Sequence, residues 1–354
     1  MKIYFLRLEH TAFGGSEVYL QRVCQILRQQ HIDFRVMHCA APKFLASWVK
    51  ALWFNLESKI KKNNKVYFSL ARVTCADIYR AGDGVHRAYM KAMGLNFWHN
   101  PLHFVYCYLE KHVFRNAKII IANSHRVKQE IIDYYNIASS KIVVIYNGIS
   151  PVQVLDETVT KLALCAQLNL PEDKPIILFV GSGFKRKGAD TFLRILAQLQ
   201  QRFSAIIVGK DKHEAKYKSL ARDLGLTHNV RFVGQRHDIE MFYTASDILL
   251  FPSRYDPFSN VVLEAMCFKN AVFTSSCNGA HEVLDPYYVI HGEKDKEIAL
   301  KIDKLLTNPK QLEQAKQHNI EKINLYSLES NVRQTLSVIQ SYMFPSDYPR
   351  TKVN

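Results

Sequence analysis

Short apolar runs alternate with stretches of helical periodicity along most of this chain, and this alternation restricts the fold more than any other feature. A run that is apolar throughout is typical of a strand buried on both faces, and strands alternating with helices predict a parallel sheet between two helical layers. The fold class is therefore expected to be α/β. The predicted strands are residues 2–8, 34–39, 65–70, 117–124, 141–147, 175–181, 204–209, 230–234, 247–253 and 270–275.

The alternation occurs twice, because it stops over residues 149–170 and then restarts. At 354 residues the chain is also too long for one typical core. We expect a Rossmann-like domain over residues 1–150, a second over 151–330, and a helical tail over 331–354 that returns toward the first domain. Ligands of such sheets bind outside the carboxyl ends of the strands, which predicts an active site in a cleft where the two domains face each other.

Charge is distributed unevenly between these predicted domains. Residues 1–150 hold 21 Lys and Arg against 9 Asp and Glu, whereas residues 151–354 hold 26 against 23. The positive excess indicates an anionic partner for the first domain. Large aromatic residues interleave with the lysines there, which favours an anionic membrane surface, and we expect no nucleic-acid partner. These residues are Trp48, Trp53, Phe54, Phe97 and Trp98, near Lys43, Lys50, Lys61, Lys62 and Lys91.

The same aromatic residues also fit a second interpretation, in which they pack in the core and the lysines are simply solvated. No apolar run reaches the roughly 18 residues that span a bilayer, and the N-terminus lacks the pattern of a signal peptide. The seven cysteines are scattered and form no CxxC pair, as expected in a reducing compartment. We expect a cytoplasmic protein, peripheral at the inner face of the cytoplasmic membrane.

Two junctions between a strand and a helix have the composition of phosphate-binding turns. In FGGSEVY, Gly14 and Gly15 precede a helix whose free N–H groups favour an anion, although a glycine pair also makes an ordinary turn. VGSGFKRKGAD nearly matches the dinucleotide fingerprint GxGxxG, but Arg186 occupies the place of the third glycine and Lys187 follows. These cations do not suit a dehydrogenase. They suit a diphosphate leaving group, unless the turn is only a solvated basic one.

A third junction, DILLFPSRYDPFSNVVLEAM, places Asp256 and Glu264 eight residues apart around the start of a helix. The segment resembles the E-x7-E motif of the retaining glycosyltransferases of family 4, which have the GT-B fold, with Asp in place of the first Glu. The resemblance implies that Asp256 faces the donor sugar as a catalytic residue and that Glu264 binds the nucleotide ribose. It also implies phosphate contacts from Phe258, Ser259 and Asn260. Without the resemblance, the two acids would be a helix cap and a surface residue.

The resemblance to this family continues over nearly the whole chain. Gly14 and Gly15 match its N-terminal glycine pair, and Lys187 matches the lysine of its R-x4-K pair. The arginine position of that pair is Ser182 here, so the resemblance implies that Arg186 supplies the charge. Further matches are ANS (122–124), YNGI (146–149), FVGQRHDI (232–239), CNGAHEV (277–283) and VGKDK (208–212), the last of which implies that Lys212 lies by the nucleotide.

One stretch narrows the resemblance further. RAGDGVHRAYMKAMGL (80–95), together with GSGFKRKGAD, is similar to the bacterial lipopolysaccharide core glucosyltransferases. That similarity implies that Asp83 lies in the acceptor site as a catalytic residue and that the basic aromatic stretch after it touches the membrane. His86 is an alternative to Asp83, and His281 is a weaker candidate at the donor sugar.

These observations predict an enzyme that moves a hexose from a nucleotide-diphosphate sugar, with UDP-glucose as the expected donor, to a lipopolysaccharide core or another lipid-linked surface glycan. The family resemblance implies retention of configuration. We expect no cofactor and no metal, because the sequence shows no DxD motif or cluster with metal-ligand spacing. Two alternatives stay open: a GT-B-fold nucleotide-sugar epimerase, and a basic membrane- or nucleic-acid-binding protein without catalysis.

Overall fold

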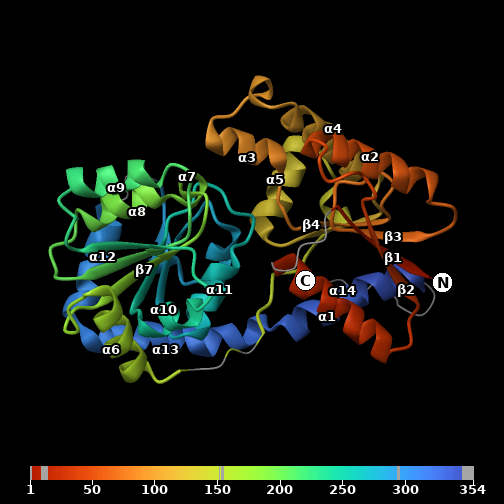
Figure 1. Cartoon of the computed structure of the whole chain (residues 1–354). Helices are drawn as coiled ribbons and strands as arrows, with labels where there is room; N and C mark the ends of the chain where they lie inside the picture. Colours follow the sequence, from red (N-terminus) through yellow and green to blue (C-terminus); the bar gives the residue numbers. More distant parts are fainter. Residues whose placement is uncertain (1, 9–14, 151, 153–154, 293–295, 345–354) are drawn as a thin grey trace. The chain divides into compact units, whose positions relative to one another are not determined.

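The computed structural model describes residues 2–8, 15–150, 152, 155–292 and 296–344, which form two compact units (Figure 1). Unit 1 consists of residues 1–147 and 328–354, and unit 2 of residues 148–327. The expected domain boundaries at 150 and 330 each lie three residues from these divisions. Unit 1 is therefore built from both ends of the chain.

Unit 1 contains a parallel six-stranded sheet in the order β2-β1-β3-β4-β5-β6. Its strands are β1 (Ile3–Arg7), β2 (Phe34–His38), β3 (Val66–Ser69), β4 (Ile78–Ala81), β5 (Ile119–Ala122) and β6 (Ile142–Val144). Its helices are α1 (Gly15–Gln29), α2 (Ser47–Ile60), α3 (His86–Met93), α4 (Pro101–Asn116), α5 (His125–Tyr135) and α14 (Leu328–Met343), with the 3-10 turns η1 (Phe97–His99) and η2 (Ser139–Lys141). The predictions missed β4, because the buried Arg80 interrupts its apolar run.

Successive residues of β1 pack against different helical layers. Phe5 belongs to a core cluster with Val23 of α1 and Val332 of α14. Leu6 packs in another cluster with Phe54 of α2. Since successive side chains of a strand point to opposite faces, helices cover both faces of this sheet, as an all-parallel sheet requires. The prediction that Phe54 is a surface anchor is wrong, because the helix turns this side chain inward and leaves it 1% exposed.

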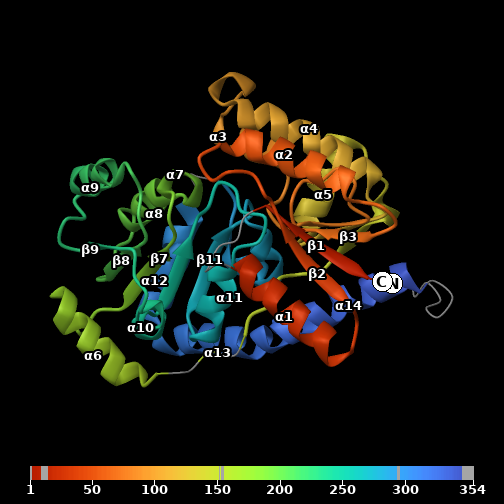
Figure 2. The same cartoon turned by 45° about the vertical axis from the view of Figure 1, so that its right-hand side comes forward.

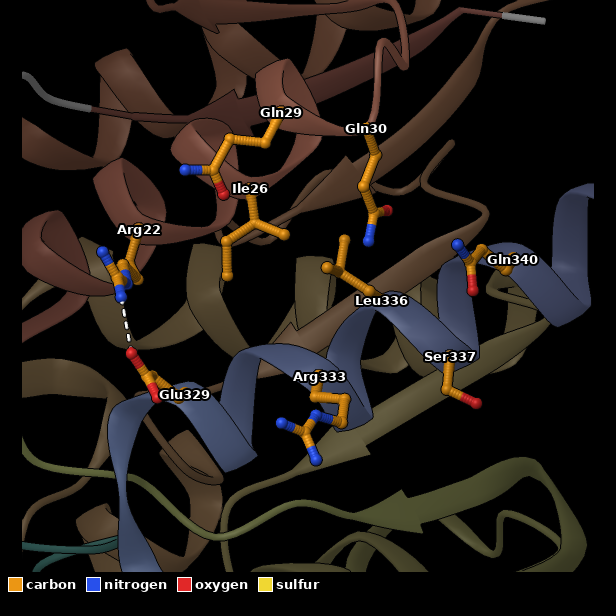
Figure 3. A pocket seen from close by; sticks show the side chains of 9 residues that line it. All are labelled: Arg22, Ile26, Gln29, Gln30, Glu329, Arg333, Leu336, Ser337 and Gln340. Atoms are coloured by element: carbon orange, nitrogen blue, oxygen red, sulfur yellow. Dashed lines mark hydrogen bonds and ion pairs between the residues drawn. The ribbon is translucent and has the colours of Figure 1, made fainter.

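Helices α1 and α14 lie side by side on one face of this sheet (Figure 2). A groove of about 460 Å³ opens between their outer surfaces, and Arg22 of α1 reaches Glu329 of α14 across it, with an NH2–Oε1 distance of 2.8 Å (Figure 3). An exposed ion pair contributes at most about 1 kcal/mol. The apolar contacts beneath the groove, including those of Ile26 and Leu336, therefore hold α14 in place.

Unit 2 contains a second parallel six-stranded sheet, in the order β12-β11-β10-β7-β8-β9. Its strands are β7 (Ile176–Val180), β8 (Ser204–Val208), β9 (Val230–Gly234), β10 (Ile248–Phe251), β11 (Ala271–Ser275) and β12 (Val289–Ile290). Figure 1 shows α8 and α9 on one side of β7 and α10 and α13 on the other, so this sheet is also a middle layer. The helices are α6 (Glu157–Leu168), α7 (Phe184–Lys187), α8 (Ala189–Leu196), α9 (Glu214–Asp223), α10 (Ile239–Ala245), α11 (Asn260–Cys267), α12 (Lys296–Thr307) and α13 (Pro309–Ile323), with the 3-10 turns η3 (Gly279–Val283), η4 (Pro286–Tyr288) and η5 (Asn324–Tyr326).

The predicted α/β class with two Rossmann-like parallel sheets is confirmed. Helix α8 ends at Leu196, and a separate single turn of helix, α7, precedes it. None of the seven cysteines forms a disulfide. Within the described ranges, no helix has the length and hydropathy needed to cross a bilayer.

Candidate active site

The loop after β7 carries the two cations that the sequence singles out. Arg186 and Lys187 are the last residues of the one-turn helix α7, and Gly188, with a φ of 77°, then leads the chain into α8. A Cβ atom on Gly188 would lie 1.9 Å from the carbonyl oxygen of Pro252, which follows β10. Strands β7 and β10 are neighbours in the sheet. Glycine at this position therefore lets the loops at their carboxyl ends touch.

We expect Gly188→Ala to destabilise the protein strongly. The substitution combines a left-handed backbone, which costs other residues roughly 1–2 kcal/mol, with a clash that must displace the backbone at Pro252. Gly183→Ala is the matched control, since Gly183 has a φ of 76° and nothing described lies within 4 Å of its Cβ position. Thermal unfolding should show a clearly larger loss of Tm for Gly188→Ala. Equal losses of Tm in the two variants would show that the clash with Pro252 does not contribute.

Asp256, in the loop after β10, accepts hydrogen bonds from both cations. Its Oδ2 atom is 2.6 Å from Nζ of Lys187 and 3.2 Å from NH1 of Arg186. Hydrogen bonds between charged groups are stronger than neutral ones, and the carboxylate side chain is only 8% exposed. The structure thus joins three predicted site residues from segments 69 and 70 residues apart.

Burial dominates the electrostatics of Lys187. Desolvation lowers the pKa of its ammonium group, although the nearby carboxylate of Asp256 acts in the opposite direction. The charge of Glu264 also acts on this ammonium group, and Nζ lies 4.8 Å from the ring centroid of Phe251. A cation held in such a site attracts an anion more strongly than it would in water.

Glu264 is held by a tyrosine that the sequence did not single out. Tyr243 of α10 donates its hydroxyl to Oε2 of Glu264 at 2.7 Å, and its ring stacks on Phe268. Burial raises the pKa of Glu264, while the tyrosine and Lys187 act to lower it. The tyrosine orients the carboxylate through one oxygen, and the other oxygen, Oε1, has no hydrogen-bond partner in the part of the chain that the structure describes.

The loop that carries Asp256 is fixed against the loop after β11. The backbone N–H of Asp256 donates to the carbonyl of Cys277 at 3.1 Å, and the N–H of Gly279 donates to the carbonyl of Asp256 at 2.9 Å. These bonds form a short parallel bridge between the two loops. The position of the carboxylate therefore depends on both loops.

The predicted phosphate turn lies directly before and at the start of α11. Ser259 is the N-cap residue, and Asn260 is the first residue of the helix. The N–H of Ser259 donates to Oδ1 of the buried Asn278 at 3.1 Å. Phe258 is buried as well, so its side chain packs in the core and only its backbone remains for the turn.

Two further residues, Asp211 and Arg254, hold the loop after β7, although neither of them is assigned a role from the sequence. Asp211 accepts from the N–H of Phe184 at 2.7 Å, so a carboxylate already occupies the first N–H of α7. A phosphate near this loop must therefore rely on the cations more than on that N–H. Arg254 makes a two-point ion pair with Asp190 of α8, at 2.9 and 2.7 Å. Burial acts to raise the pKa of Asp190, but the hydrogen bonds from Arg254 help to bring it below its usual value.

The remaining donor-site candidates lie on other segments of the chain. Lys212 is exposed in the turn before α9 and makes no ion pair with Asp256 among the described residues. His281 lies in η3, where its Nδ1 is 2.8 Å from the carbonyl oxygen of Asn278. Gly15 is the first residue of α1 in unit 1, and Gly14 lies outside the described residues. Across the described ranges, no group of three His, Cys, Asp or Glu side chains is placed to hold a metal ion.

Asp83 lies in unit 1, in a turn directly after β4. The N–H of Gly84 closes this turn on the carbonyl of Ala81 at 3.1 Å, and the Asp83 side chain is 73% exposed. The alternative candidate, His86, is buried, and its Nε2 is 3.0 Å from Nδ1 of His103. Burial is the main cause that lowers the pKa of His86 to about 3, so its ring is neutral at physiological pH. Geometry favours Asp83 over His86 as the group that meets a ligand.

Two Rossmann-like units, one of which holds a carboxylate between two cations at the carboxyl ends of its strands, define a protein of the GT-B class. Family comparison agrees: the model for "Glycosyltransferase Family 4" matches residues 13–153, and the model for "Glycosyl transferases group 1" matches residues 160–322. The chain belongs to the group 1 and family 4 glycosyltransferases.

Individual relatives place the chain near enzymes of lipopolysaccharide synthesis. The lipopolysaccharide glucosyltransferase WaaG of Escherichia coli is 35% identical over 121 residues, which are 33% of this chain and 32% of that protein. A crystal structure of WaaG, a glycosyltransferase involved in lipopolysaccharide biosynthesis, superposes with a TM-score of 0.78 at 20% identity over 95% of this chain and 99% of that one. The predicted resemblance to lipopolysaccharide core glucosyltransferases is confirmed.

A second fold neighbour has been solved with nucleotide and sugar. HepE of Anabaena, in complex with UDP and glucose, has a TM-score of 0.72 at 18% identity over 96% of this chain and all of that one. At these identities the solved structures show the GT-B fold alone. The sequence alignments span 44–50% of the length of the first three curated relatives.

Proposed function

We propose that this chain transfers a hexosyl group from a nucleotide-diphosphate sugar to the core of lipopolysaccharide or another lipid-linked surface glycan, with retention of configuration. The observation that carries this proposal is the contact of Asp256 with Arg186 and Lys187, next to Glu264, inside the group 1 domain. UDP-glucose is the donor to test first, because HepE binds UDP and glucose and WaaG is a glucosyltransferase.

In this proposal the cations serve the leaving group. When the bond between C1 of the sugar and the diphosphate breaks, negative charge grows on the phosphate oxygens, and Arg186 and Lys187 stabilise it from fixed positions. When the donor binds, one of the contacts of Asp256 with the cations is replaced by a contact with a hydroxyl of the donor sugar. Glu264 accepts a hydrogen bond from a ribose hydroxyl. Two side-chain cations take the place of a metal ion, so we propose that no metal is required.

The acceptor side of the reaction is assigned to Asp83. The acceptor hydroxyl attacks C1 on the face from which the nucleotide leaves, the new C1–O bond forms as the old one breaks, and the acceptor proton passes to the departing phosphate oxygen. Asp83 orients this hydroxyl. Asp83→Ala should therefore lower turnover and leave nucleotide binding unchanged.

One assay separates the proposed transfer from the alternatives. UDP-glucose is incubated with the purified chain, with and without a lipopolysaccharide-core acceptor, and the products are analysed by chromatography. A glucosylated product that requires the acceptor supports the proposal. Isomerised donor without acceptor would indicate an epimerase, and no turnover together with salt-sensitive nucleic-acid binding would indicate a binding protein.

We also propose that unit 1 binds an anionic membrane through the exposed side of α2, η1 and α4. The residues Trp48, Leu52, Leu56 and Ile60 recur every four positions and form a stripe along α2. Helices α2 and α4 pack together through buried contacts of Val105. The exposed apolar set of this aromatic face is Trp48, Leu52, Trp53, Leu56, Ile60, Phe97, Trp98, Phe104 and Tyr108, and exposed lysines nearby in the chain are Lys59, Lys61, Lys91 and Lys111.

The double variant Leu56→Ala, Trp98→Ala should bind vesicles containing phosphatidylglycerol at least about tenfold more weakly, because burying one such side chain is worth roughly 1.5–3 kcal/mol. Trp98 is 95% exposed, so its loss should leave the fold intact. Leu300→Ala is the control, since Leu300 lies in unit 2 and is exposed to about the same extent as Leu56. Co-sedimentation with anionic and neutral vesicles measures the effect. Unchanged binding of the double variant would rule out the aromatic face as the docking surface.

A further inference from the structure

Glu110, on α4, is a fully buried carboxylate that the proposed reaction does not use. Its oxygens accept hydrogen bonds from Nε of Arg72 at 2.8 Å, from the hydroxyl of Tyr135 at 2.8 Å, and from the backbone N–H of His86 at 2.8 and 2.9 Å. Burial raises the pKa of Glu110, whereas these donors act to lower it. A buried acid surrounded by donors from three other segments is an anchor for the loops that supply them.

Arg72 extends this anchor to the surface. It lies in the loop after β3, its guanidinium carbon is 4.5 Å from the ring centroid of Tyr106, and its NH1 atom is 3.4 Å from Oδ2 of Asp83. One planar group thus contacts a buried carboxylate, an aromatic face and an exposed carboxylate. The exposed carboxylate is the one proposed to orient the acceptor.

The segment around Asp83 is fixed on two further sides. Nδ2 of Asn123, at the end of β5, donates to the carbonyl of Gly82 at 3.1 Å. Directly after the turn, α3 begins at His86, whose ring contacts His103 of α4 at 3.0 Å. With its backbone held in this way, the direction of the Asp83 carboxylate depends on its ion pair with Arg72.

We propose that Arg72 is a positioning residue for the acceptor site: anchored by Glu110, it holds the carboxylate of Asp83 in the direction that the acceptor hydroxyl requires. This inference rests on the proposed function, because it assigns a partner to the proposed acceptor residue. It gives Arg72 and Glu110 a role on the acceptor side of the reaction. Neither residue takes part in the proposed donor binding.

Arg72→Lys is the first test. Lysine keeps the positive charge beside Glu110, but it lacks the planar fork in which Nε of Arg72 meets Glu110 while NH1 meets Asp83. We expect kcat/KM for the acceptor to fall between about 10- and 100-fold, as for a slightly misplaced reacting group, while the affinity for UDP is unchanged. Arg35→Lys, at an exposed position of β2 in the same unit, is the matched control and should behave like the wild type.

A double-mutant cycle with Asp83→Asn decides whether Arg72 acts through Asp83. If it does, adding Arg72→Lys to Asp83→Asn changes acceptor kinetics little. Equal losses from Arg72→Lys in both backgrounds, or wild-type acceptor kinetics in the single variant, would overturn the inference. If Arg72→Lys folds poorly, Arg72→Gln with Glu110→Gln removes both buried charges together and should show the same acceptor-specific loss.

Measurements on the wild-type chain separate a failure of the positioning role of Arg72 from a failure of the proposed function. Transfer by the wild type, combined with wild-type kinetics in the Arg72 variants, would overturn the positioning role alone. A wild type that binds UDP but transfers to no acceptor would overturn the proposed function, and with it the role of Arg72.

Discussion

Replacing Lys187 with methionine is expected to lower kcat for glycosyl transfer by about 10²- to 10³-fold, the size of effect seen when a fixed donor to a developing negative charge is removed. The physical reason is its position: Nζ is held 2.6 Å from Asp256 in a largely buried site. Methionine is an unbranched, flexible side chain one atom shorter than lysine, and it carries neither the charge nor the N–H donors. Steady-state kinetics with UDP-glucose and acceptor measure the change.

Two comparisons make this prediction specific. Lys185→Met changes an exposed lysine on the same helical turn and should retain the wild-type rate. Because burial lowers the pKa of Lys187, the wild-type rate should also fall as the pH rises through that pKa and the ammonium group loses its proton. In Lys187→Arg the charge persists at alkaline pH, so this fall should be absent. A Lys187→Met variant with wild-type kcat would show that this cation does not serve the leaving group.

Glu264→Ala is expected to weaken UDP binding by about 10- to 100-fold, since a hydrogen bond to a charged group is worth roughly 1.5–3 kcal/mol and each 1.4 kcal/mol is a factor of ten. Its carboxylate is oriented by the hydroxyl of Tyr243 at 2.7 Å, and alanine has no acceptor to put in its place. Isothermal titration calorimetry with UDP gives the dissociation constant directly.

The alanine variant also leaves the buried hydroxyl of Tyr243 without its acceptor. An effect on protein stability must therefore be separated from an effect on UDP binding. Glu264→Gln keeps one oxygen that can accept from Tyr243, replaces the other with an NH2 group and removes the charge. Because the tyrosine keeps its acceptor, this variant should lose less affinity than Glu264→Ala. Tyr243→Phe removes the orienting bond alone and should give an intermediate loss of affinity. If Glu264→Ala bound UDP as the wild type does, the ribose assignment would be wrong.

Much of the fold follows from local chemistry in the sequence. Ten apolar runs predict strands where the structure has them, and the two that were missed have local reasons: Arg80 breaks the run at β4, and β12 has only two residues. In parallel sheets of this kind, the loops at the carboxyl ends of the strands carry the chemistry. Their place in such a loop marks Arg186 and Lys187, whereas Asp256 and Glu264 are singled out by the resemblance of their segment to the E-x7-E motif.

What the sequence cannot determine is which of these groups meet. The contact of Asp256 with Lys187 spans 69 positions and exists because β7 pairs with β10, a strand order that periodicity does not encode. Tyr243 and Glu110 carry no motif, since their roles arise only from burial beside a carboxylate or a cation. Local patterns determine the elements and their loops, whereas long-range packing decides the partners, because desolvation and hydrogen bonding act between residues that are close in space and far apart along the chain.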